Sequence, residues 1–207
     1  MSKKNHHRKK ILCDAAVCAD LNWGIGNKGG LLVHIPEDME SFKKFTKDSI
    51  LIMGRKTQES FPNHKYLKGR INIVMSHRFK RNAGYQVSYG DKVKDEVLYS
   101  ELYYVNSMDD AYNLANEIYF SNKKEFSRIV VIGGATIYKE FLDAGLIKTV
   151  LLTRVYSKYD CDASIPDLYS TYGFKHHNGK TNIVTGYESI TKSRDGKHNF
   201  SIRALTK

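Results

Sequence analysis

The chain has 207 residues, of which 41% are hydrophobic and 27% charged, a composition typical of one globular domain. It contains no long apolar run that could span a membrane and no apolar segment near the start, so we expect a cytoplasmic protein without a membrane anchor or secretory leader. The three cysteines are odd in number and lack CxxC spacing, which favours free thiols over disulfides or zinc ligands.

Positive charge is concentrated at the N-terminus. The net charge is +11, and five Lys and Arg residues lie in the first ten positions, which leaves +6 for the remainder. Because this segment is highly charged and has almost nothing apolar to bury, residues 1–10 are predicted to be a basic disordered tail and residues 11–207 the folded domain. The tail is either a solvated extension or a weak contact for nucleic acid or a membrane surface.

Short apolar runs alternate with helical segments in the first part of the chain. A buried strand is predicted at 11–19, followed by a long glycine-rich loop at 20–35 without regular structure. Pro36 and the acids after it are typical of a helix start, and Glu40 and Lys44 have the spacing of an i,i+4 ion pair. The next elements are expected to be a strand at 49–54, a helical turn at 55–61 and a strand at 70–76.

The second part continues the alternation. Residues 77–102 are hard to interpret and suggest only a short strand at 85–89. A helix capped by Ser107 is predicted to about residue 122, then a strand, a Gly-Gly turn and a helix at 128–142, a strand at 148–156 and a C-terminal hairpin. This order predicts an α/β fold, with a mainly parallel mixed sheet flanked by helices and a C-terminal antiparallel hairpin.

Three predicted strand ends carry groups that suit an anion. Gly133-Gly134 lies between a strand and a helix, where backbone N–H groups can hold a phosphate, although such a turn is often purely structural. Residues 54–57 and 76–78 each combine a hydroxyl with cationic side chains, which would also suit solvated strand ends. If the strands are parallel, the three ends meet at one edge of the sheet and form a site for a ligand with several phosphates.

Asp38 is a further candidate, because offsets of four and seven residues place it on the same helical stripe as Phe42 and Phe45. It is either an acid that serves the helix dipole or a half-buried carboxylate that binds a planar amidine-like ligand and has a raised pKa. The sequence has no pattern of metal ligands and no nucleophile motif, so we assign neither a metal site nor covalent catalysis.

Several motifs in order along the chain resemble the dihydrofolate reductase family. They are WGIG at 23–26, HIPEDMESFKKFT at 34–46, ILIMGRKTQES at 50–60, LKGRINIVMS at 67–76, VIGGATIYKEFL at 131–142, LTRV at 152–155 and DASIP at 162–166. The resemblance implies NADPH-dependent reduction of 7,8-dihydrofolate to 5,6,7,8-tetrahydrofolate, with a hydride reaching C6 and a proton N5. It also implies dihydrofolate and its analogues as ligands, and we expect a monomer.

The resemblance also implies roles for individual residues. Asp38, Thr153 and Tyr138 match the catalytic positions, with Asp38 on the pterin amino edge and Thr153 supporting it. Residues matching the substrate pocket are Ala16, Val33, Met39, Phe42, Phe61, Leu67 and Arg70, of which Arg70 matches the arginine that pairs with the glutamate α-carboxylate. Residues matching the coenzyme site are Ile25, Gly26, Gly54, Arg55, Lys56, Thr57, Ser76, His77, Arg78, Ile132, Gly133, Gly134, Ala135, Thr136 and Ile137.

The chain departs from the family pattern at Val33, where members usually have a tryptophan, and this puts the path of proton delivery in question. Ala135 replaces a glycine of many members. Two alternatives stay open at this point: the pyrimidine reductase of riboflavin synthesis, which shares the fold, and a non-catalytic basic module. The pair of Asp38 and Arg70 argues against the first, because that substrate carries a ribosyl phosphate and no glutamate.

Overall fold

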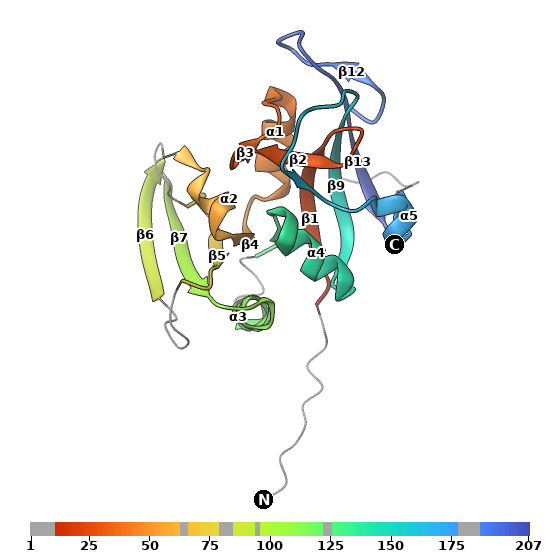
Figure 1. Ribbon diagram of the computed structural model, residues 1–207. Coiled ribbons are helices and arrows are strands. Elements are labelled where there is room, and N and C mark those ends of the chain that lie inside the picture. Colours follow the sequence, from red (N-terminus) through yellow and green to blue (C-terminus); the bar gives the residue numbers. More distant parts are fainter. Residues whose placement is uncertain (1–10, 63–65, 79–84, 94–95, 122–125, 178–186) are drawn as a thin grey trace, which may run out of the picture.

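The computed structural model describes residues 11–62, 66–78, 85–93, 96–121, 126–177 and 187–207 (Figure 1). The predicted basic tail at 1–10 lies outside the described residues. The strands of the main sheet are β1 (Cys13–Ala19), β4 (Ser49–Gly54), β5 (Ile71–Met75), β6 (Tyr85–Val93), β7 (Glu96–Val105), β8 (Arg128–Val131), β9 (Ile147–Val155), β11 (Lys175–His176), β12 (Thr191–Lys192) and β13 (Asn199–Thr206).

The centre of this sheet is parallel and its margins are antiparallel. The strand order is β11-β13-β9-β1-β8-β4-β5-β7-β6, with β12 paired to β13. From β9 to β7 every neighbouring pair is parallel, whereas β13 and β6 run antiparallel to their partners. The predicted α/β fold with a C-terminal antiparallel hairpin is therefore confirmed.

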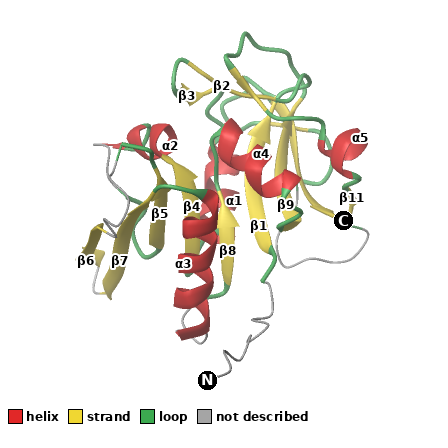
Figure 2. Ribbon diagram, turned by 60° about the horizontal axis from the view of Figure 1, so that its bottom comes forward, coloured by secondary structure: helices red, strands yellow, loops and turns green. Residues whose placement is uncertain are grey.

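Helices cover both faces of the sheet. They are α1 (Pro36–Phe45), α2 (Arg55–Glu59), α3 (Met108–Ser121), α4 (Ala135–Asp143) and α5 (Leu168–Tyr172). Helices α3 and α4 pack on one face and α1 on the other, each against a separate buried cluster (Figure 2). Ser107 caps α3 as predicted, since its hydroxyl accepts a hydrogen bond from the Asp110 N–H. Among the described helices, none has the length and apolar content needed to cross a membrane.

Two segments contain strands that the sequence did not indicate. The glycine-rich loop forms β2 (Gly24–Asn27) and β3 (Gly30–Leu31), which join β10 (Ala163–Ser164) in a small antiparallel sheet. A Cβ on Gly26 would lie 2.8 Å from the Gly30 carbonyl oxygen, so glycine permits this close pairing. The second segment, expected to hold one short strand, forms the long hairpin β6–β7 at the sheet edge.

Candidate active site

Asp38 lies in the first turn of α1, half-buried beside the neighbouring strand β9. The Thr153 hydroxyl donates a hydrogen bond of 2.5 Å to the Asp38 carboxylate, and Thr153 itself is buried in β9. Burial raises the pKa of Asp38 to about 6, against the opposing effects of the Thr153 hydrogen bond and the nearby His34. Asp38 is therefore more than a helix-dipole acid, because a carboxylate removed from water and fixed by a neighbour can bind a polar ligand edge.

Apolar side chains surround this carboxylate. The buried cluster on the α1 face includes Ala16, and several half-buried residues pack against it. The predicted pocket residues among them are Val33, Phe42, Phe61 and Leu67. Met39 is half-buried on α1 but does not belong to this cluster. The structure thus brings five of the six predicted apolar pocket residues together on the side of the sheet that carries Asp38.

Arg70 follows the loop before β5, and its guanidinium is held by the protein backbone. Its Nε donates to the Thr46 carbonyl at 2.9 Å, and its terminal nitrogens donate to the carbonyls of Lys68 at 2.5 Å and Lys43 at 3.2 Å. No carboxylate of the described residues forms a salt bridge with it. Burial lowers the pKa of Arg70, yet the guanidinium stays charged at neutral pH and is fixed in place by these hydrogen bonds.

A cavity of about 720 Å³ opens at the carboxyl ends of the parallel strands. Fourteen of the fifteen predicted coenzyme residues line it; Arg78, exposed beside His77, does not. The lining residues are Ile25, Gly26, Gly54, Arg55, Lys56, Thr57, Ser76, His77, Ile132, Gly133, Gly134, Ala135, Thr136 and Ile137. The expectation that three strand ends converge on one site is therefore confirmed in the fold.

Glycines shape the wall of this cavity. The Gly133-Gly134 peptide bond is cis, and the Gly133 carbonyl accepts a 2.7 Å hydrogen bond from the Gly54 N–H. Gly133 has a φ of +108°, and a Cβ there would lie 3.0 Å from the Tyr138 ring, so only glycine fits without strain. Gly134 caps α4 without a side-chain hydrogen bond, which leaves backbone N–H groups of the first turn for an anion.

Tyr138 connects the two parts of the site. Its side chain is buried under the Gly133 turn, and its hydroxyl donates a hydrogen bond to the Ala16 carbonyl of β1. Burial raises the pKa of Tyr138, so the phenol stays protonated and the hydrogen bond persists at neutral pH.

The basic side chains of the cavity differ in whether an acid of the protein already pairs with them. Arg55 forms an ion pair with Glu59 one turn later on α2, through both carboxylate oxygens. Lys56 and His77 are exposed at the cavity wall. The sequence treats Arg55, Lys56 and His77 alike, whereas the structure engages Arg55 with an acid on its own helix.

Asn106 is a cavity residue that the sequence analysis missed. It lies directly after β7, and its side-chain oxygen is buried without a hydrogen-bond partner among the described residues. Because β7 runs parallel to β5, its carboxyl end reaches the same edge as the other three strand ends. Recognising β7 as a strand would therefore have pointed to Asn106.

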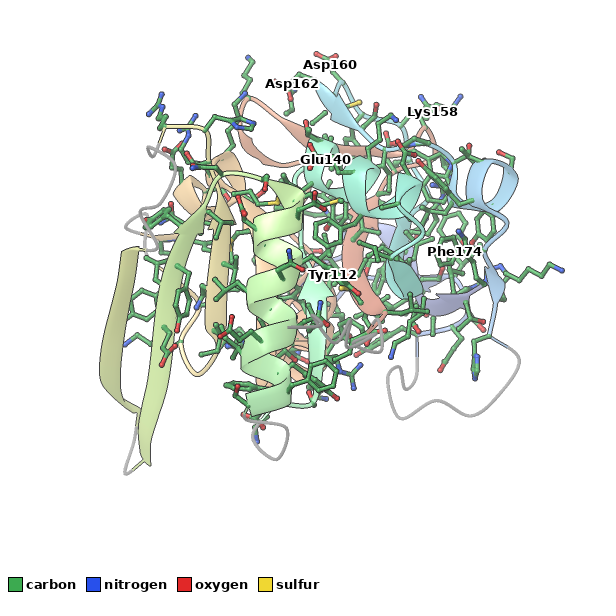
Figure 3. The ribbon with its side chains drawn as sticks, turned by 90° about the horizontal axis from the view of Figure 1, so that it is seen from below. Tyr112, Glu140, Lys158, Asp160, Asp162 and Phe174 are labelled. Carbon is green, nitrogen blue, oxygen red and sulfur yellow. The ribbon has the colours of Figure 1, made fainter. Side chains whose placement is uncertain are left out.

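Acidic residues border the cavity on the side of the glycine-rich loop. Glu140 of α4 and Asp162 both line it, and Figure 3 shows Asp160 and Asp162 at the same end of the molecule as Glu140. The Asp162 carboxylate accepts a 2.9 Å hydrogen bond from the Lys28 N–H, and the Asn27 side chain donates to the Asp160 carbonyl at 3.0 Å. These bonds fix the β2–β3 loop over the cavity.

The single tryptophan of the chain does not replace the one absent at position 33. Trp23 is buried at the base of the loop, with the Arg154 guanidinium 4.2 Å from its ring centroid and Tyr169 against its edge. Val33 is half-buried in the cluster below Asp38 and has no hydrogen-bond donor in its side chain. The structure therefore does not bring the single tryptophan to the place of Val33.

Comparison with known proteins agrees with this geometry. The family model described as dihydrofolate reductase matches residues 13–188. The chain is 35% identical over 160 residues to a bifunctional dihydrofolate reductase-thymidylate synthase of Plasmodium chabaudi, covering 77% of this chain and 23% of that protein. It is 33% identical over 166 residues to the dihydrofolate reductase of Schistosoma mansoni, covering 74% of this chain and 77% of that protein.

This chain covers a smaller share of the length of other relatives. The chain spans 34% of the Schizosaccharomyces pombe dihydrofolate reductase, to which it is 30% identical, and 27% of the bifunctional protein of Glycine max. The match nevertheless extends over most of the present chain and includes Asp38, Arg70, the Gly133-Gly134 turn and Thr153. The chain belongs to the dihydrofolate reductase family.

Proposed function

We propose that this chain catalyses the NADPH-dependent reduction of 7,8-dihydrofolate to 5,6,7,8-tetrahydrofolate. The observation that carries the proposal is Asp38, a half-buried carboxylate with a pKa raised to about 6, fixed by Thr153 at the wall of an apolar pocket. A carboxylate in this setting is ionised at neutral pH and presents two acceptors to the amino and N3–H edge of a pterin.

On the substrate side, Asp38 orients the pterin and Thr153 keeps the carboxylate in place. Phe42 and the apolar residues around it pack on the flat ring and the aminobenzoyl group. Arg70 binds the α-carboxylate of the glutamate, since its guanidinium is already oriented by backbone carbonyls. Binding both ends of the substrate fixes its position relative to the coenzyme. This lowers the entropic part of the barrier to hydride transfer.

The residues of the cavity fit NADPH. The uncapped first turn of α4 offers backbone N–H groups to a pyrophosphate, and the buried oxygen of Asn106, which has no partner among the described residues, can accept from an amino group of the ligand. Lys56 offers a positive charge and His77 a ring N–H to a 2′-phosphate. When bound, NADPH supplies the hydride. The protein's part is to hold the coenzyme beside the pterin and keep bulk water out through the β2–β3 loop.

The residues around the proposed path of proton delivery differ from the family pattern at Val33. Asp38 accepts hydrogen bonds from the pterin edge and does not itself protonate N5, so water supplies the proton. Val33 offers no donor to hold that water, so the water is either held by backbone groups or lost. The chain therefore reaches the same product with a less restrained water near the acid.

Oxidation of NADPH followed by absorbance tests the proposal against its rivals. The proposal predicts dihydrofolate-dependent oxidation that methotrexate blocks. Turnover of a ribosyl-phosphate pyrimidine without dihydrofolate turnover would support the riboflavin-type reductase, and the absence of any oxidation would support a non-catalytic module. The family match and the position of Arg70 favour the first outcome.

We propose in addition that the chain acts as a cytoplasmic monomer, that nucleic acid contacts at most the predicted tail, and that residues 11–207 form the catalytic domain. The domain itself carries only a moderate positive charge, which suits two anionic small molecules better than a polyanion. Light scattering of the purified chain with and without DNA tests both points: a dimer, or a tail-independent complex, would contradict them.

A further inference from the structure

We propose that the turn at residues 193–198, between β12 and β13, is a clamp that positions α1 and thereby Asp38. The inference rests on the proposed function only in the role that it gives to Asp38. Figure 1 shows the β12–β13 hairpin at the same end of the molecule as α1, although the two lie far apart in the sequence. Arg194 of this turn makes the contacts that carry the proposal.

Arg194 grips two acids of α1. Its backbone N–H donates to Glu37 Oε1 at 2.8 Å and its Nε donates to the same oxygen at 3.1 Å, while Nη2 donates to Glu40 at 2.6 Å. The Glu37 side chain is only 3% exposed, so Arg194 provides the positive charge that a buried carboxylate requires. Glu37 is the residue immediately before Asp38. The Glu40–Lys44 pair expected from sequence is replaced by this long-range contact, since Glu40 bonds to Arg194.

The start of α1 has Pro36 and two acids in its first turn but no side-chain cap. Its N-cap residue is Ile35, which has no side-chain acceptor, and the structure records no side-chain capping bond there. A helix whose first turn is uncapped frays unless tertiary contacts hold it. Arg194 supplies such contacts to the first two turns, in which Asp38 lies.

The clamp is itself rigid and anchored. The Ser193 hydroxyl donates to Asp195 at 2.5 Å and accepts from the His198 N–H at 3.0 Å, which closes the turn. His198 Nδ1 lies 3.0 Å from the Tyr159 hydroxyl, in the segment next to the β2–β3 loop. The turn is therefore tied, through Tyr159, to the buried cluster against which α1 also packs.

The same hairpin supports the other partner of the Asp38–Thr153 hydrogen bond. In the sheet, Ile202 of β13 pairs directly with Thr153 of β9. One hairpin thus fixes Thr153 through strand pairing and Asp38 through Arg194. Residues 193–198 are positioning residues, because they reach the site only through α1.

Arg194→Gln tests the clamp, with Lys139→Gln as the matched control, because Lys139 forms an exposed ion pair with Asp143 on α4 outside the site. Hydrogen exchange of the amides of residues 39–42 measures the helix start directly. We expect lower protection of these amides in Arg194→Gln only. The KM for dihydrofolate and the Kd for methotrexate should rise by about tenfold, with the Kd for NADPH unchanged. Arg194→Lys keeps a charge beside Glu37 but loses the fork, and should fall between wild type and Arg194→Gln.

Unchanged protection of α1 in Arg194→Gln would overturn the clamp. So would lower protection with wild-type affinity for methotrexate and dihydrofolate, because the contact would then be structural only. An equal loss of NADPH affinity would point to general destabilisation and also overturn it. If the wild type fails to reduce dihydrofolate, the proposed function falls, whereas hydrogen exchange still decides whether Arg194 holds α1.

Discussion

On the proposed substrate side of the site Asp38 and Arg70 are each held by hydrogen bonds within the protein, whereas the proposed coenzyme side is an open cavity with a mixed lining of glycines, apolar side chains and charged groups. Asp38 is fixed by Thr153, and Arg70 by three backbone carbonyls. The cavity is shaped instead by glycines at positions where a Cβ would collide. On the proposed function, recognition of the reacting ring would depend on a few pre-oriented charges, while coenzyme binding would be spread over many small contacts.

The largest effect is expected from removing the charge of Asp38. Asp38→Asn keeps the shape of the side chain but weakens the grip on the pterin edge, and should lower turnover at pH 7 by at least about a hundredfold, or roughly 2.7 kcal/mol. Steady-state kinetics with dihydrofolate measure it. A near wild-type rate would mean that Asp38 only serves the helix dipole.

The preference for NADPH over NADH tests the coenzyme side of the site. NADPH should be preferred over NADH by about a hundredfold, since each charge-assisted bond to a 2′-phosphate contributes on the order of 1.5–3 kcal/mol. Arg55→Ala combined with Arg78→Ala should reduce this preference, whereas Glu59→Gln, which releases Arg55 from its ion pair, should preserve it. Equal kcat/KM for the two coenzymes in wild type would refute the assignment.

Stability should change in the opposite direction from activity at Asp38. Its pKa is raised to about 6, so between about pH 4 and 6 the folded state binds more protons than the unfolded one, and ionisation of Asp38 destabilises the fold as pH rises. Asp38→Asn should therefore raise the free energy of unfolding above pH 6 by on the order of 2 kcal/mol. Denaturant titrations at pH 7.5 and pH 4 check this: an equal effect at both pH values would argue against the raised pKa.

Local patterns predicted the central strands and the helices well. Strand 49–54 was predicted from its apolar run, and α3 from the helical spacing of its apolar residues and its Ser107 cap. Both signals lie within a short stretch of sequence. The β2–β3 strands were not predicted, because β2 pairs with β10 more than a hundred residues away and β3 has only two residues. The hairpin β6–β7 was missed because cross-strand pairing, rather than one apolar face read from sequence, defines it.

The site was predicted through motifs, which did not give the partners of its charged side chains. Arg55 is predicted to bind a phosphate, and the structure adds an ion pair with Glu59 that the sequence did not indicate. Glu37 was interpreted as an acid that complements the helix dipole, and the structure shows it buried against Arg194. Neither partner can be chosen from sequence alone, because a charged side chain has several candidates within reach and only the folded chain selects one.

A smaller effect is expected at Val33, where the substrate side lacks a donor for water. Val33→Trp should raise kcat near neutral pH severalfold without changing NADPH affinity, because an indole N–H can hold the proton-donating water. Single-turnover rates across pH measure it, with wild type as the reference. A slower or unchanged variant at pH 7 would show that the loop packs differently and that Trp is overpacked there, which commonly costs about 1–3 kcal/mol.

The smallest effect is expected from the predicted basic tail at residues 1–10. Deleting residues 1–10 should leave kcat and the melting temperature nearly unchanged, because this segment offers only Met1 as an apolar residue for docking. It should also reduce salt-sensitive adsorption to polyanions, measured on a heparin column. A truncated chain that fails to fold or to bind NADPH would contradict the predicted domain boundary.

The pH dependence of hydride transfer in a single turnover, compared between wild type and Asp38→Asn, tests the central claim most directly. With Asp38 as the ionised group that orients the pterin, the deficit of the variant should be largest above pH 7. The deficit should shrink below pH 6, where wild type loses the charge and solvent protonates more substrate. Two profiles separated by a constant factor at every pH would contradict the account, because the ionisation of Asp38 would then have no part in the reaction.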